Sequence, residues 1–157
     1  TSRSVTDRTG FSYHPDEYYC GIMEVLGKNN MAELAIAEVD GKAVAVHIMI
    51  YADGIATYAH GASLKEYRAC MAPALLYWKT ILRAKEREMH MYDFFGVAPE
   101  NASDEHPWSG ITRMKLGFGG TRVSYAGAHD LVFNEALYTM FNVTRRAKSF
   151  LKSSLTS

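Results

Sequence analysis

Three short runs of strand-forming residues, joined by two tight turns, constrain the fold of this chain most strongly. Residues 31–39, 44–51 and 55–60 are rich in Val, Ile, Leu and Tyr, and the first run alternates in polarity. Asp-Gly pairs at 40–41 and 53–54 separate the runs. Because this dipeptide favours the short turns of β-hairpins, the sequence predicts an antiparallel meander of three strands.

The pattern changes on both sides of this meander. Apolar residues at helical spacing predict four helices, at 16–26, 73–89, 107–117 and 134–151. Further strands are predicted at 91–97 and 122–126. This order predicts an α/β (α+β) protein with a mixed, mostly antiparallel sheet and helices on both faces. It resembles the GNAT acyltransferase fold, in which the fourth and fifth strands splay. We therefore expect a cleft between 55–60 and 91–97.

Length and composition favour a single domain without a membrane span. The chain has 157 residues, its formal net charge is zero, and it holds no run of about 18 apolar residues. Cys20 and Cys70 have neither metal-ligand nor disulfide-framework spacing, which predicts buried thiols in a cytoplasmic protein. The chain does not begin with Met, so we expect a piece of a longer protein.

Three residues near the predicted cleft are candidates for chemistry. Lys115 stands near the end of the 107–117 helix, where a cation stabilises a helix C-terminus or lies beside a cleft. Asp93 lies on a strand expected to be half buried, so its carboxylate needs a partner. It is either a structural hydrogen-bond acceptor or a group that orients an amine or Lys115. Gly96 follows two Phe residues and predicts a positive φ or a close approach to a ligand.

Other polar residues allow both a functional and a structural interpretation. His60 and His106 are possible acid–base groups, although neither has a carboxylate partner visible in the sequence. No His, Cys or Asp cluster has metal-ligand spacing, so no metal is expected. Basic residues on two helices could contact a tRNA backbone, but a solvated helix face is the commoner explanation, and the zero net charge supports it. They are Lys79, Arg83, Arg87, Arg145, Arg146 and Lys148.

Four ordered stretches carry a more specific resemblance. They are Arg8-Thr-Gly-Phe, Tyr58-Ala-His-Gly-Ala-Ser63, Met71-Ala-Pro-Ala-Leu-Leu-Tyr-Trp78, and Tyr92-Asp-Phe-Phe-Gly96 followed by Met114-Lys-Leu-Gly-Phe-Gly-Gly120. Together they resemble the second GNAT-like half of the Fem family, the FemA, FemB and FemX type of aminoacyl-tRNA-dependent peptidoglycan ligases. Family members carry two such halves, so the resemblance implies that residues 1–157 form one GNAT-like domain whose N-terminal partner half lies elsewhere.

The resemblance implies transfer of an amino acid from aminoacyl-tRNA to the amino group of a muropeptide stem, nucleotide-linked or lipid-linked. No bound cofactor is expected, because aminoacyl-tRNA is the co-substrate. Met114 and Lys115 match the Phe-Lys pair at the family's reacting centre, with Met replacing Phe, and Asp93 completes the catalytic candidates. Tyr58 matches a contact to the nucleotide-sugar substrate.

The remaining substrate-binding candidates are weaker matches. Arg8 and Tyr13 are possible phosphate contacts, and His60 and Gly96 complete the set. Each also has a plain structural interpretation, such as a solvated loop charge for Arg8.

Two alternatives remain open at this point. The first is an acetyl-CoA-dependent N-acetyltransferase on the same fold. Its pyrophosphate loop needs glycines and backbone N–H donors, whereas Met71 occupies a glycine position and Pro73 has no N–H. The second is a non-catalytic half-domain that binds a substrate or partner. Whether this half of a Fem-like protein takes part in catalysis or only binds a substrate or partner, we expect the isolated chain to be poorly active.

Overall fold

The computed structural model describes residues 14–154, so Arg8 and Tyr13 lie outside the described residues. The chain divides into two compact units, one reaching Gly120 and the other beginning at Thr121, and each is described by itself. In the first unit, a four-stranded sheet has the order β1-β2-β3-β4. The strands are β1 Ala32–Val39, β2 Lys42–Ala52, β3 Ile55–Ser63 and β4 Met91–Asp93.

The predicted meander is confirmed. β1 pairs with β2 and β2 with β3, both antiparallel, whereas β4 joins β3 in parallel. The turns are those predicted, since Asp40, Gly41, Asp53 and Gly54 all have positive φ. The sheet is therefore mixed and mostly antiparallel.

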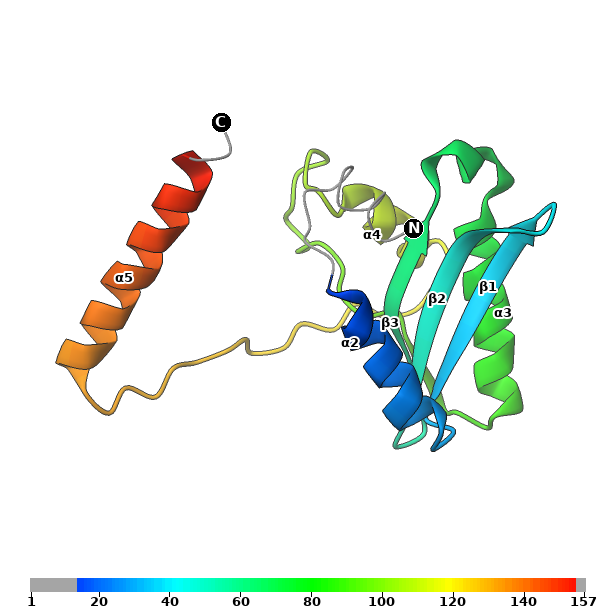
Figure 1. Cartoon of the computed structure of the whole chain (residues 1–157), viewed down its shortest axis with the longest axis horizontal. Coiled ribbons are helices and arrows are strands. Elements are labelled where there is room, and N and C mark those ends of the chain that lie inside the picture. The colour runs from blue at the N-terminus through cyan, green and yellow to red at the C-terminus, as the bar shows by residue number, and fades with distance from the viewer. Residues whose placement is uncertain (1–13, 155–157) are drawn as a thin grey trace. The chain divides into compact units, whose positions relative to one another are not determined.

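Helices lie on both faces of this sheet (Figure 1). On one face is α2, Asp16–Ile22, which continues as a π-helical turn, η1, over Met23–Gly27. On the other is α3, Ala72–Glu86, preceded by the 3₁₀ turn η2, Lys65–Cys70. A short helix, α4, covers Ser109–Leu116. In the second unit, residues 121–133 lead to α5, Glu135–Ser154.

α3 supplies most of the helical contribution to the core. Leu76, Tyr77, Thr80 and Ala84 are buried, and they recur at the three- and four-residue spacing that places them on one helix face. Tyr77 packs with Met49 and other buried residues of β2 and β3 in one cluster, and Leu76 packs in a second. The helix is thus fixed along the sheet with its N-terminus beside the end of β3.

Several predicted boundaries and environments are wrong. The strand predicted at 91–97 ends at Asp93, because the Asp93 carboxylate accepts a hydrogen bond from the Phe95 N–H at 2.7 Å and Phe95 turns away with φ 62°. The strand predicted at 122–126 is irregular, since among the described residues no strand pairs with it. The thiols of Cys20 and Cys70 are exposed rather than buried.

β3 contains a β-bulge. His60 is paired with Ile48 and Tyr58 with Met49, so Ala59 is one extra residue on β3. In a regular strand, residues three apart face opposite sides of the sheet. The bulge therefore brings Tyr58 and Gly61 to the same face, the one that α3 covers, and leaves His60 on the other.

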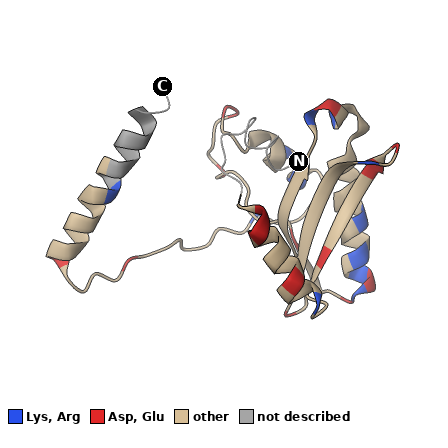
Figure 2. Ribbon diagram, viewed as in Figure 1, with Lys and Arg blue, Asp and Glu red and all other residues tan. Residues whose placement is uncertain are grey.

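An ion cluster joins β1 to the C-terminal half of α3. The Glu33 carboxylate accepts hydrogen bonds from Arg83 at 2.8 and 3.0 Å, from Arg87 at 2.6 Å and from the Tyr51 hydroxyl at 3.1 Å. In Figure 2, blue residues on α3 stand beside a red one on β1. Two members of the predicted basic row on α3 therefore already have a partner within the protein.

This cluster predicts an acid-dependent loss of stability. Hydrogen bonds from Arg83 lower the pKa of Glu33 from 4.5 to about 2, against the opposing effect of burial. Because the folded-state pKa is lower, the stabilisation is fully present above pH 4.5 and is lost as the pH falls towards 2. Glu33→Gln should cost about 1–2 kcal/mol of unfolding free energy at pH 7, after allowance for solvent screening.

Urea unfolding at pH 7, 4 and 3 measures this effect. The difference between the wild type and Glu33→Gln should shrink across the series. Glu86→Gln is the matched control, because its ion pair with Arg83 is exposed, and it should cost less than about 0.5 kcal/mol. Equal costs for the two variants would contradict a special role for Glu33.

No helix within residues 14–154 combines the length and the hydropathy that crossing a bilayer requires.

Candidate functional site

A pocket opens where β3 and β4 part. The two strands pair only over three residues, from Ile55↔Met91 to Thr57↔Asp93, and β3 then continues alone to Ser63. The pocket has a volume of about 590 Å³ and is lined by the second half of β3, by η2 and the start of α3, by α4 and by residues 95–96. The cleft predicted between these strands is confirmed.

Tyr58 stands in the wall of this pocket, held against Gly61. A Cβ atom added at Gly61 would lie 2.7 Å from Cζ and 2.8 Å from Cε2 of Tyr58, and closer still to the hydroxyl. The bulge at Ala59 brings the two residues to one face, and the missing side chain leaves room for the phenol. The spacing Tyr-x-x-Gly in this stretch therefore has a steric reason.

Lys115 lies against the wall of the pocket. Its side chain is only 5% exposed, its ammonium donates a 2.7 Å hydrogen bond to the Gly96 carbonyl, and it lies 5.4 Å from the centre of the Tyr58 ring. Burial lowers the pKa of Lys115 from 10.5 to about 8, and the charge of Asp93 partly offsets this shift. The ammonium therefore contacts two residues of the pocket wall, Gly96 and Tyr58, and does not extend into the open part of the pocket.

The neighbouring candidates support this arrangement in different ways. Asp93 is the structural acceptor for the Phe95 N–H, and its charge also acts on Lys115. Met114 lines the pocket and packs against the core. The positive φ expected at Gly96 falls on Phe95, and the close approach at Gly96 is to a side chain of the protein, since a Cβ there would lie 3.3 Å from the Trp108 ring.

His60 does not reach this pocket. It shares the opposite sheet face with α2, where its Nε2 lies 3.3 Å from the Tyr18 hydroxyl and its ring contacts His14 and Tyr19. Of the eight catalytic and substrate-binding candidates, the structure therefore brings Tyr58, Gly96, Met114 and Lys115 together, with Asp93 adjacent. Arg8 and Tyr13 lie outside the described residues.

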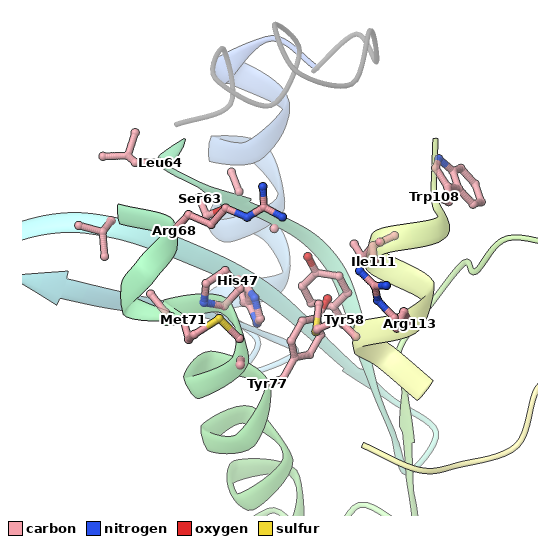
Figure 3. A pocket seen from close by; sticks show the side chains of 18 of the residues that line it. His47, Tyr58, Ser63, Leu64, Arg68, Met71, Tyr77, Trp108, Ile111 and Arg113 are labelled. Atoms are coloured by element: carbon pink, nitrogen blue, oxygen red, sulfur yellow. The ribbon is translucent and has the colours of Figure 1, made fainter. Parts of the chain in front are cut away.

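Several residues that line the pocket could not be predicted from the sequence as site residues. His47 and Tyr77 form the floor and Arg68 and Arg113 reach inward from η2 and α4, as Figure 3 shows. A signal existed for His47, which is the one strongly polar residue in the otherwise apolar run from 43 to 50. Arg113 had no such signal, because a basic residue in a short helix is usually solvated.

The pocket shows no metal site. Within residues 14–154, no three His, Cys, Asp or Glu side chains are grouped so that they could hold a metal ion. The ionic and polar chemistry available at the pocket is that of two arginines, one buried lysine, three tyrosines, one histidine, one serine and one tryptophan.

Solved structures define the class of the fold. A predicted acetyltransferase with acetyl-CoA from Clostridium acetobutylicum aligns with a TM-score of 0.61 at 15% identity, covering 85% of this chain and 86% of that one. The aminoglycoside 6′-N-acetyltransferase AAC(6′)-IG from Acinetobacter haemolyticus aligns with a TM-score of 0.54 at 15% identity, covering 84% and 96%. The chain therefore has a GNAT-like acyltransferase fold.

The family follows from the sequence. The profile of the FemAB family matches residues 41–146, which is more than half of the chain, and the chain belongs to this family. It is also 24% identical over 91 residues to the aminoacyltransferase FemA of Staphylococcus epidermidis. That alignment covers 58% of this chain and 22% of FemA, so the chain spans only a small part of its relative.

Proposed function

We propose that this domain is one half of an aminoacyltransferase that moves an amino acid from aminoacyl-tRNA to the amino group of a muropeptide stem. The proposal rests on membership of the FemAB family and on the similarity to FemA, whose name describes an aminoacyltransferase. A second GNAT-like half, N-terminal to this one in the complete protein, would supply the rest of the acceptor site. The isolated chain should then turn over slowly or not at all.

The pocket is the observation that carries this proposal. Its walls are aromatic and aliphatic, with Tyr67, Phe95 and Trp108 among the lining residues, and Arg68 and Arg113 add positive charge. Aromatic walls suit a sugar or base, and guanidinium groups suit phosphate. Both substrates of the proposed reaction contain sugar and phosphate, namely a nucleotide-linked muropeptide and the end of a tRNA.

Lys115 would supply positive charge close to the reacting centre. Acyl transfer to an amine develops negative charge on the acyl oxygen, and a fixed cation in a dry site lowers the energy of that state. The Lys115 ammonium is buried and held by the Gly96 carbonyl, so its position is fixed before substrate binds. Asp93 and Met114 would then act by holding the Lys115 region in place.

Acetyl-CoA is the competing ligand, because structural neighbours of this fold are acetyltransferases. The start of α3 is poorly suited to its pyrophosphate. The N–H of Met71 donates to the Arg68 carbonyl, and those of Ala74 and Leu75 donate to the Met71 carbonyl. Pro73 has no N–H at all, so few backbone donors remain for an anion.

A transfer assay on the full-length protein tests the proposal. With charged tRNA and nucleotide-linked or lipid-linked muropeptide, we expect transfer by the full-length protein and little by residues 1–157 alone. Arg68→Ala and Arg113→Ala should each weaken binding of the phosphate-bearing substrate about tenfold, while Lys85→Ala, an exposed cation of α3 that does not line the pocket, serves as the charge-matched control. Tight binding of acetyl-CoA by calorimetry, with no transfer from charged tRNA, would replace the proposal with N-acetylation.

A further inference from the structure

Two buried side chains of α4 bind one short stretch of backbone. Thr112 and Lys115 are the buried residues of this helix, at 6% and 5% exposure, and their three-residue spacing places them on one helix face. The Thr112 hydroxyl oxygen accepts a 2.8 Å hydrogen bond from the Ala98 N–H, and the Lys115 ammonium donates one to the Gly96 carbonyl at 2.7 Å. The helix is thus held at two points against residues 96–98.

Residues 96–98 lack a neighbouring strand. β4 ends at Asp93, and among the described residues no further strand joins the sheet beyond β4. Ala98 is nevertheless only 4% exposed, and a buried backbone N–H without a partner is costly. Thr112 supplies the acceptor that a neighbouring strand would otherwise give. Thr112 itself is not among the residues that line the pocket, so any effect it has there passes through other residues.

The position of the Lys115 ammonium depends on where the Gly96 carbonyl lies. A lysine side chain is long and flexible, and its ammonium carries three donors. Within residues 14–154, the Gly96 carbonyl is the one hydrogen-bond acceptor that this ammonium reaches. Because only one residue separates Gly96 from Ala98, the hydrogen bond that fixes Ala98 also restricts the Gly96 carbonyl.

We propose that Thr112 is a positioning residue for aminoacyl transfer, which fixes the Gly96 carbonyl through Ala98 and thereby holds the Lys115 ammonium at the pocket wall. This inference rests on the proposed function for the role of Lys115 in transfer. The ammonium is then in place before substrate binds, which is the condition under which a fixed cation lowers a barrier most. Burial, which lowers the pKa of Lys115 to about 8, reflects the same close approach of α4 to residues 96–98.

Thr112→Val removes the hydroxyl and keeps the shape of the side chain. The Ala98 N–H then lacks its acceptor, so the unfolding temperature should fall. Thr80→Val is the matched control, because Thr80 is also a buried helix residue, at 4% exposure, and its hydroxyl bonds the Leu76 carbonyl and the Tyr92 hydroxyl. It should lower the unfolding temperature as well. Thr112→Ser keeps the hydroxyl and should resemble the wild type.

The pKa of Lys115 in the full-length protein separates positioning from a merely structural role. The ¹³Cε resonance of Lys115, assigned by its absence in Lys115→Met, is followed by NMR as a function of pH. In Thr112→Val, water should enter between α4 and residues 96–98 and raise this pKa from about 8 towards 10.5, while Asp93 still acts on the ammonium. Thr80→Val and Thr112→Ser should leave it unchanged.

Two results of this titration would overturn the inference. One is an unchanged Lys115 pKa in Thr112→Val, and the other is an equal rise in Thr80→Val. If Thr112→Val does not fold, Thr112→Ala removes the same hydroxyl and leaves room for a water at the Ala98 N–H, and the same rise is expected.

Kinetics test whether Thr112 acts through Lys115. Thr112→Val in the full-length protein should lower kcat about tenfold with little change in KM, because the lining of the pocket is kept. In a Lys115→Ala background, Thr112→Val should cause no further loss of kcat. A further tenfold loss in that background would show that Thr112 acts by another route, and the inference would fail.

The outcome also separates this inference from the proposed function. If the Lys115 pKa responds to Thr112→Val but charged tRNA supports no transfer, Thr112 still positions the lysine and aminoacyl transfer fails. If transfer occurs and Thr112→Val changes neither kcat nor the Lys115 pKa, aminoacyl transfer stands and the positioning role fails.

Discussion

Gly61→Ala will displace Tyr58 and disable the pocket while leaving the backbone conformation of β3 acceptable. The φ of Gly61 is not positive, so alanine brings no backbone strain of its own. Its methyl group would, however, lie within 2.8 Å of two ring carbons of Tyr58. The phenol must therefore leave its place beside Lys115. We expect a loss of about 1–3 kcal/mol in unfolding free energy and at least a tenfold loss in ligand affinity.

A double-mutant cycle checks the steric origin of this effect. In a Tyr58→Leu background, Gly61→Ala should cost much less than in the wild type, because the clashing ring is absent. Gly21→Ala is the matched control: a Cβ there meets nothing within 4 Å in α2, so it should stabilise the helix by about 0.5–1 kcal/mol. A full cost of Gly61→Ala in the Tyr58→Leu background would show that the bulge itself, and not the phenol, requires glycine.

Lys115→Ala in the full-length protein should lower kcat by a factor of about 30 to 1,000. This corresponds to about 2–4 kcal/mol of barrier, the range expected when a preorganised group that stabilises the transition state is removed. Lys85→Ala, an exposed lysine of α3, is the control and should leave the rate unchanged. An unchanged rate for Lys115→Ala would restrict the lysine to holding the Gly96 carbonyl.

The depressed pKa of Lys115 predicts opposite trends for activity and stability. Activity should fall as the pH rises through about 8, because the ammonium loses its proton. The folded-state pKa lies below the ordinary value of 10.5, so charging Lys115 opposes folding below pH 8, and this cost disappears as the pH rises from 8 to 10.5. The wild type should gain up to about 3 kcal/mol relative to Lys115→Met between pH 7 and 10.5, measured by denaturant unfolding.

Much of the fold could be predicted from local chemistry. The two Asp-Gly turns and the change of period after Ser63 predict the meander and α3, and the cleft follows from the order of the strands. The prediction of a strand through residue 97 fails because the Asp93 side chain competes for the Phe95 N–H, an interaction that depends on its rotamer. Apolar alternation alone does not reveal such a turn.

The candidate site could be predicted only in part. Lys115 and Tyr58 stood out through the stretches that resemble the Fem family, but nothing in those stretches indicated that the ammonium would bind a carbonyl in the wall. His47 and Tyr77 come from two elements about 30 residues apart, and their meeting depends on how α3 lies on the sheet. His60 was misjudged because the bulge at Ala59 changes which residues share a face.

The extra residue at Ala59 has a consequence for anyone who aligns or redesigns this protein. It divides β3 into two segments whose side chains alternate out of step with each other. The first segment pairs with β4, and the second continues along the pocket. Deleting Ala59 would restore an even alternation and exchange the roles of the inner and outer positions on one side of the deletion. A sequence alignment that places the gap opposite a neighbour of Ala59 would therefore exchange buried and solvent-facing positions. This error would remain even where the aligned residues are identical.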